Sequence, residues 1–138
     1  EADLYAVLSA CYGLSAESNL FKAASHGTQS GRMIDKALAI DSKNAFVYMI
    51  KGIGDYTRPS FAGGSKENGI INLKKAIEIY QQNPEDNLES ILIISHYHLA
   101  EIFYRKKDYE QSIEYLGKTL GIASNYKRAL ELSKKIES

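Results

Sequence analysis

The sequence has few cysteines and no excess of charge of either sign, and each of these absences excludes certain functions. It has one cysteine, Cys11, so no disulfide can form within the chain. Lysine and arginine together number 17, as do aspartate and glutamate, which makes the formal net charge zero. Proteins that bind nucleic acids usually carry a basic excess or a basic stripe, whereas the basic residues here are scattered among acidic ones. We therefore expect no nucleic-acid partner.

Long hydrophobic runs and prolines are scarce as well. The longest apolar runs are far too short to cross a membrane, and no signal peptide is visible. The chain begins at Glu1 rather than Met, which slightly favours an exported protein with its leader removed over a cytoplasmic one. The compartment stays open, because an exported helical protein needs no disulfide. The two prolines, Pro59 and Pro84, lie where helices are expected to break.

What the sequence does have is aromatic and aliphatic residues at helical spacing, with almost none of the alternation that strands show. This pattern predicts an all-α protein. Ser65 is a candidate N-cap, and capping boxes begin at Asp86 and Asp108. The predicted helices cover residues 2–17, 29–41, 44–57, 66–82, 87–106, 109–122 and 125–137.

Three segments of the chain resemble one another, at residues 33–40, 72–79 and 115–122. Each has an apolar residue, then a lysine, a small residue and two aliphatic residues. Successive small residues are 39 and then 43 positions apart. Such a period indicates a repeat of helical units that stack on one another. The aligned small residues are Ala37, Ala76 and Thr119.

The last unit carries the most specific motif. It reads Leu99-Ala100, then Phe103, then Lys107-Asp108-Tyr109, and ends on Ser112-Ile113. This motif resembles the tetratricopeptide repeat family, although His96, Lys107 and Thr119 replace the usual Trp, Gly and Ala. The period is also longer than the ~34 residues of that family, so we expect the excess in loops or lengthened helices. We expect the following residues to pack together between the last two paired helices: Leu99, Ala100, Phe103, Leu116 and Leu120.

The resemblance implies a single domain over residues 1–138, folded as an α-α superhelix. It would contain about three helical hairpins and a closing helix. The hairpins would cover residues 2–41, 44–82 and 87–122, and the closing helix residues 125–137. A narrower resemblance lies in one loop, where Pro59 and Phe61 precede Gly63-Gly64-Ser65. This loop is similar to that of exported bacterial tetratricopeptide proteins, some of which are accessory components of transporters.

The sequence shows no catalytic, cofactor or metal site. His96 and His98 are two positions apart, so on a helix they point to nearly opposite sides, whereas a metal pair needs a spacing of three or four. His96 stands where the family has a large core residue, so we expect it to be buried and hydrogen-bonded. His98 and Glu101 do have the spacing of a metal pair, but two ligands without a third make a poor metal site. The third histidine is His26, and Cys11 lacks neighbours that would activate a thiolate.

In tetratricopeptide proteins the first helix of each hairpin lines the concave surface, and carrying this over by register predicts a partner-binding groove. An alternative is that some of these side chains pack under loops or against the long fifth helix. Glu101 and Arg105 are four positions apart, so we expect them to pair. The predicted groove residues are Phe46, Met49, Ile53, Tyr56, Tyr97, Glu101, Tyr104 and Arg105. The first hairpin would add Val7, Ala10, Leu14 and Glu17.

The loop at residues 57–65 is a further candidate contact. Free amides at the start of the next helix attract anions, but the spacing of a phosphate-binding loop is absent. The alternative is that the glycines only permit a tight connection. The residues that would contact a ligand here are Arg58, Phe61, Gly63, Gly64 and Lys66.

These observations predict a non-catalytic protein–protein interaction scaffold that holds a peptide or partner segment in the groove. The alternative is a small-molecule or lipid-binding accessory protein of a bacterial transport system. The first needs an open groove, and the second an enclosed apolar pocket roofed by the 57–65 loop. Some relatives grip a carboxylate with Lys, Asn and Arg, but Phe46, Met49 and Ile53 stand at those positions here.

Overall fold

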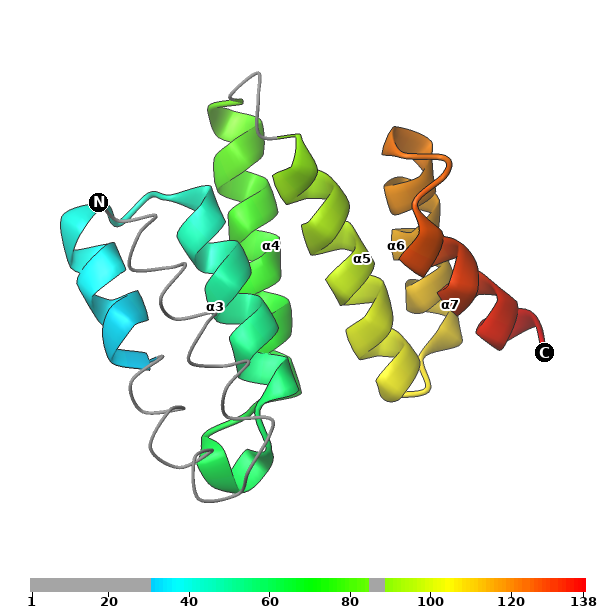
Figure 1. The fold of residues 1–138 in the computed structure, drawn as a ribbon, viewed down its shortest axis with the longest axis horizontal. Coiled ribbons are helices and arrows are strands. Elements are labelled where there is room, and N and C mark those ends of the chain that lie inside the picture. Colours follow the sequence, from blue (N-terminus) through cyan, green and yellow to red (C-terminus); the bar gives the residue numbers. More distant parts are fainter. Residues whose placement is uncertain (1–30, 85–88) are drawn as a thin grey trace.

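The structure is a computed structural model that describes residues 31–84 and 89–138 (Figure 1). Within these residues it is helical throughout and contains no strand, so the all-α prediction is confirmed. The predicted helix over residues 2–17 lies outside the described residues. Residues 31–40 are helical. The elements that follow are α3 (Ala45–Thr57), the 3-10 turn η1 (Ser60–Ala62), α4 (Lys66–Gln82), α5 (Ser90–Arg105), α6 (Tyr109–Ile122) and α7 (Lys127–Glu137).

Side-chain caps explain why three of these helices begin where they do. Asn44 accepts a hydrogen bond from the Val47 amide at the start of α3. Ser65 caps α4 in the same way, as predicted. Asp108 caps α6 as predicted and also accepts a hydrogen bond from the Gln111 side chain. The predicted cap at Asp86 lies outside the described residues, and α5 begins at Ser90 with no side-chain cap.

The turn between α5 and α6 contains the residue that departs from the family motif. Lys107 has a φ of 62°, in the left-handed region that glycine adopts most readily. The amide of Asp108 donates to the carbonyl of Phe103, and the amide of Lys107 donates to that of Tyr104. This is the geometry of a helix that ends on a left-handed residue. Glycine at position 107 would therefore fit the backbone without strain.

The helices pack in consecutive pairs along a row (Figure 1). The helix at residues 31–40 packs on α3 through Ile34, Ala37 and Val47. Helix α3 packs along α4, and α5 packs along α6. The pairs are joined by contacts of α5 with both α4 and α3. Helix α7 contacts both α6 and α5 at the carboxyl end of the row.

Helix α5 separates two hydrophobic clusters, and this corrects one prediction. Leu99 and Phe103 belong to the cluster shared with α3 and α4. Ala100, Leu116 and Leu120 belong instead to a cluster shared with α7. The five residues expected to pack together are therefore divided, because α5 is covered on two sides. Tyr115 packs against both clusters and lies parallel to the Phe103 ring.

The backbones of α3 and α4 approach most closely at two glycines. A Cβ atom on Gly52 would lie 2.7 Å from Leu73 Cγ and 3.1 Å from the carbonyl oxygen of Gly69. A Cβ atom on Gly69 would lie 3.0 Å from Tyr56 Cβ and 3.2 Å from Ile102 Cδ1 of α5. A Cβ atom at Gly52 would overlap Leu73, and one at Gly69 would require its neighbours to move by a few tenths of an ångström. The two glycines therefore set the separation of α3 and α4 and bring α5 against both.

Gly52→Ala should lower the free energy of unfolding by about 1–3 kcal/mol, the usual cost of overpacking a close helix contact. Denaturant unfolding followed by circular dichroism would measure it. The matched control is Gly117→Ala in α6, where an added Cβ meets nothing within 4 Å. Alanine should stabilise the helix there by about 1 kcal/mol, because glycine is a poor helix former. Equal effects of the two substitutions would contradict a close contact at Gly52.

Phe103→Ala should lower the free energy of unfolding by about 3–5 kcal/mol, because it removes a buried ring and leaves a cavity. The Phe103 side chain is buried in the cluster of α3, α4 and α5 and stacks on Tyr115. Thermal and denaturant melts would measure the loss. An unchanged melting temperature would mean that Phe103 does not occupy this core position.

Candidate functional site

The structure distributes the predicted groove residues between the core and the surface. Met49, Tyr56 and Tyr97 are buried, at 4%, 5% and 6% exposure. The prediction that they form an exposed apolar wall is therefore wrong. These three side chains pack inside the protein, as the alternative interpretation expected for some of the groove residues. Phe46, Ile53, Tyr104 and Glu101 are partly buried, and Arg105 is exposed. Val7, Ala10, Leu14, Glu17, Cys11 and His26 lie outside the described residues.

The buried tyrosine of α3 forms a polar network with α5. The Tyr56 hydroxyl donates to Glu101 Oε2 at 2.7 Å and lies 2.5 Å from His98 Nδ1. Because that hydroxyl has one proton and gives it to Glu101, the geometry requires His98 to donate from Nδ1. Sequence reasoning did not place His98 in the site, because its contact with Tyr56 depends on the packing of a separate helix.

Arg105 completes this network at the surface. Its Nη2 atom donates to Glu101 Oε1 at 3.0 Å, which confirms the predicted pair. Its guanidinium carbon also lies 5.2 Å from the centre of the Tyr56 ring, within range of a cation–π contact. The Arg105 side chain is 45% exposed, while the Glu101 side chain is 18% exposed. The Arg105 guanidinium is therefore positioned by Glu101 and by the Tyr56 ring, and it is open to solvent.

The network changes the proton affinity of its members. Burial alone raises the pKa of Glu101, but hydrogen bonds from His98 and Tyr56 and the charge of Arg105 outweigh it and lower the pKa to about 2. Burial, followed by the hydrogen bond to Glu101, raises the pKa of the Tyr56 hydroxyl far above its usual value. At neutral pH the pair is therefore a carboxylate and a phenol, and the phenol is a poor nucleophile.

A second arginine lies against a second buried tyrosine. The Arg128 guanidinium of α7 lies 4.7 Å from the centre of the Tyr97 ring. Tyr97 also meets the edge of Tyr126, at 5.6 Å between ring centres, and the edge of His98, at 5.2 Å. Together these contacts connect α3, α5 and α7 on one side of the row. We call this side the tyrosine–arginine face, made of Tyr56, Tyr97, Glu101, Arg105, Tyr126 and Arg128.

The candidate loop is tied to α3 by a buried carboxylate. Asp55 is 6% exposed and accepts a hydrogen bond from Asn72 at 2.7 Å. Arg58 Nη2 lies 3.6 Å from the Asp55 carboxylate, and Arg58 Nε donates to the Gly54 carbonyl. The Ser65 amide donates to the Asp55 carbonyl at 2.7 Å. The Arg58 side chain is therefore directed to the last turn of α3 through its Nε and Nη2 atoms.

The two loop glycines have structural reasons to be there. Gly63 has a φ of 89°, and a Cβ on Gly64 would lie 1.8 Å from the Arg58 carbonyl oxygen. Both glycines therefore permit a tight connection, which was the alternative to ligand contact. Phe61, at 67% exposure, and Lys66 remain exposed at the surface. Three of the five candidate loop residues, Phe61, Gly63 and Lys66, are thus exposed.

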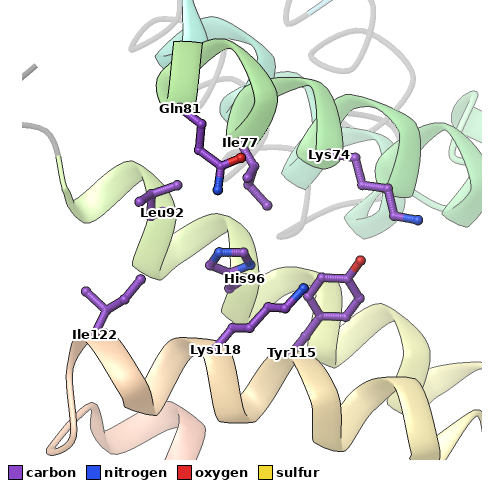
Figure 2. A pocket seen from close by; sticks show the side chains of 8 residues that line it. All are labelled: Lys74, Ile77, Gln81, Leu92, His96, Tyr115, Lys118 and Ile122. Atoms are coloured by element: carbon purple, nitrogen blue, oxygen red, sulfur yellow. The ribbon is translucent and has the colours of Figure 1, made fainter. Parts of the chain in front are cut away.

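A hollow of about 420 Å³ opens between α4, α5 and α6, on the side of α5 that carries His96 (Figure 2). Sequence reasoning did not predict it, because its lining comes from three helices that are far apart in the chain. The 57–65 loop does not line it. We call it the α4–α5–α6 hollow, and its lining is Lys74, Ile77, Gln81, Leu92, His96, Tyr115, Lys118 and Ile122.

His96 is buried, as expected, but it lacks the expected hydrogen bond. It is 7% exposed, and its Nδ1 atom has no partner. Its ring stacks on Tyr115, 6.0 Å away. Burial, followed by the charge of Lys118, lowers the pKa of His96 to about 4, so the imidazole is neutral at pH 7. The prediction that His96 and His98 point to opposite sides is confirmed, since they reach α6 and α3 respectively.

Some kinds of site do not occur in the described part of the chain. No three His, Cys, Asp or Glu side chains there are grouped closely enough to hold a metal ion. Among residues 31–84 and 89–138, no helix is both long and apolar enough to cross a membrane. Comparison with protein families, with curated proteins and with solved structures finds no match to this chain.

Replacing Glu101 should remove a part of the pH dependence of stability. Its pKa is lowered from 4.5 to about 2, so its stabilising effect is present above pH 4.5 and is lost as the pH falls towards 2. At pH 7, Glu101→Gln should cost on the order of 1–2 kcal/mol, allowing for screening by water. Urea unfolding at a series of pH values would show the two proteins converging near pH 2.

The control for this measurement is Glu78→Gln on α4. Glu78 is exposed and forms none of the ion pairs found among the described residues. Its substitution should leave the curve of stability against pH parallel to that of the wild type. A constant difference between wild type and Glu101→Gln from pH 7 to 2 would refute the stabilised carboxylate.

Proposed function

We propose that the chain is a non-catalytic interaction module of the tetratricopeptide type, which holds a partner segment on its tyrosine–arginine face. Three features of the packing support the repeat. The helices pair consecutively, α3 with α4 and α5 with α6. Among the leading helices of successive pairs, α5 also contacts both α3 and α7. The α5–α6 turn has the left-handed residue at the position where the family has glycine.

The observation that carries the proposal is the placement of two arginines on one face. Arg105 and Arg128 come from different helices, and each guanidinium lies over the ring of a buried tyrosine. Arginine side chains are costly to order, and here the order exists before a partner binds. The Glu101 contact engages Nη2 of Arg105, and a guanidinium has five N–H groups. The others can donate to a carboxylate of the partner.

The neighbouring side chains suggest what else the partner carries. Ile53 and Tyr104 are partly exposed on α3 and α5. Tyrosine and arginine are the side chains that most often anchor protein interfaces. The partner segment is therefore one that combines acidic with apolar side chains. Small-molecule binding, the second candidate, is favoured by a different feature, the α4–α5–α6 hollow.

The test is selection from a random displayed peptide library, followed by titration of an enriched peptide. Acidic peptides with apolar residues should be enriched. The double substitution Arg105→Gln with Arg128→Gln should weaken their binding about tenfold or more, equivalent to ~1.4 kcal/mol, because it removes both guanidinium groups. The far-ultraviolet circular dichroism spectrum should not change, since both side chains reach the surface.

The charge-matched control is Lys134→Gln with Lys135→Gln, two exposed residues in the last turn of α7. This pair removes the same charge from another place and should bind peptide as the wild type does. Equal losses in both double variants would mean that net charge alone attracts the peptide. Unaltered binding in the arginine variant would place the interface elsewhere.

A further inference from the structure

We propose that the α4–α5–α6 hollow is a binding site for a small organic carboxylate with a hydrocarbon tail. The site lies on the side of α5 that faces α6, whereas the tyrosine–arginine face involves α3 and α7, so the proposal does not depend on the interaction function. Its volume of about 420 Å³ falls within the range of small-ligand sites, roughly 300–1,000 Å³. The arrangement of the lining residues indicates the class of ligand.

The lining is polarised along its length (Figure 2). At one end are Leu92 and Ile122, with Ile77 and the amide of Gln81 beside them. At the other end the Lys118 ammonium approaches the Tyr115 ring, and Lys74 lines the same end from α4. Such a division suits a ligand with an apolar body and one charged terminus. The apolar end is small, so the tail is short or of medium length.

The charge of the lining selects an anion. It contains two lysines and no acidic residue. Lys118 lies 5.0 Å from the centre of the Tyr115 ring and 3.7 Å from Glu114, an exposed neighbour outside the lining. Lys74 forms none of the ion pairs found in the described residues. One ammonium group is thus weakly paired and the other is available.

His96 gives an independent reason to expect a ligand. Its Nδ1 atom is one of two buried side-chain polar atoms without a hydrogen-bond partner in the described structure, and it alone of these belongs to a lining residue. A buried polar atom without a partner is uncommon and costly, so it calls for an explanation. In Figure 2 the imidazole lies between the apolar and the cationic ends. A carboxylate seated on the lysines can accept a hydrogen bond from the imidazole.

The groups that face His96 decide how binding depends on pH. Tyr115 stacks on the ring and the charge of Lys118 acts on it, and the other polar groups of the lining are Lys74 and Gln81 from α4. With the hollow empty, burial and the charge of Lys118 keep the imidazole neutral at pH 7. A carboxylate beside it favours the charged imidazolium. Bound ligand should therefore raise the pKa of His96, and affinity should increase as the pH falls from 7 to 5.

The experiment is a titration of the full chain with sodium octanoate, followed by two-dimensional NMR. The amide signals of residues around the hollow should shift in a saturable way, and the ring protons of His96 should report the raised pKa. Octylammonium chloride, with the same tail and the opposite charge, should produce no such shifts. Sodium acetate should bind more weakly, since it lacks the tail.

Two double variants separate the site from general charge. Lys74→Gln with Lys118→Gln should weaken octanoate binding about tenfold or more, because charge-assisted hydrogen bonds are lost. Lys75→Gln with Lys127→Gln removes the same charge from exposed positions outside the lining and should bind as the wild type does. Three results would overturn the proposal: equal affinity in the two variants, equal binding of octylammonium, or no saturable shift at the hollow.

Discussion

The close contact of α3 with α4 at Gly52 and Gly69 is the constraint on which the other contacts depend. Because neither residue has a side chain, the two backbones come near enough for Tyr56 Cβ and Ile102 Cδ1 to close over Gly69. Tyr56 then reaches across to α5, where its hydroxyl meets His98 and Glu101. A wider crossing would draw Tyr56 away from α5 and leave a carboxylate and an imidazole buried without it. The spacing of α3 and α4 therefore determines whether the polar network between α3 and α5 can form.

Helix α5 distributes its side chains between two surfaces with different chemistry. His98 and Glu101 turn towards α3, and His96 turns towards α6. The two buried histidines differ in the groups that surround them. His98 has the Tyr56 hydroxyl and the Glu101 carboxylate close to it. His96 has the ammonium group of Lys118 near it and no partner for its Nδ1 atom. One helix thus contributes to a satisfied polar network on one side and an unsatisfied one on the other.

Much of the helical layout could be predicted from the sequence, because caps and periodicity are local signals. Ser65 and Asp108 begin their helices as expected, and Glu101 pairs with Arg105 as their spacing predicts. The burial of Tyr56 and Tyr97 could not be predicted from the sequence, because it depends on the distances between α3, α5 and α7. The hollow has the same origin, since three separate helices line it. Register along one helix places a side chain on a face but does not tell what covers that face.

The buried Asp55 makes the connection between α3 and α4 part of the rigid body of the protein. Its carboxylate holds Asn72 and Arg58, and its carbonyl holds the Ser65 amide. Most loops of this length tolerate cleavage and inserted residues, because their backbone groups face water. This one is closed at both ends by bonds to a single residue. A foreign segment would be accommodated better between α6 and α7, where Ser124 and Asn125 are exposed, so that is the natural place to graft a tag or a second domain.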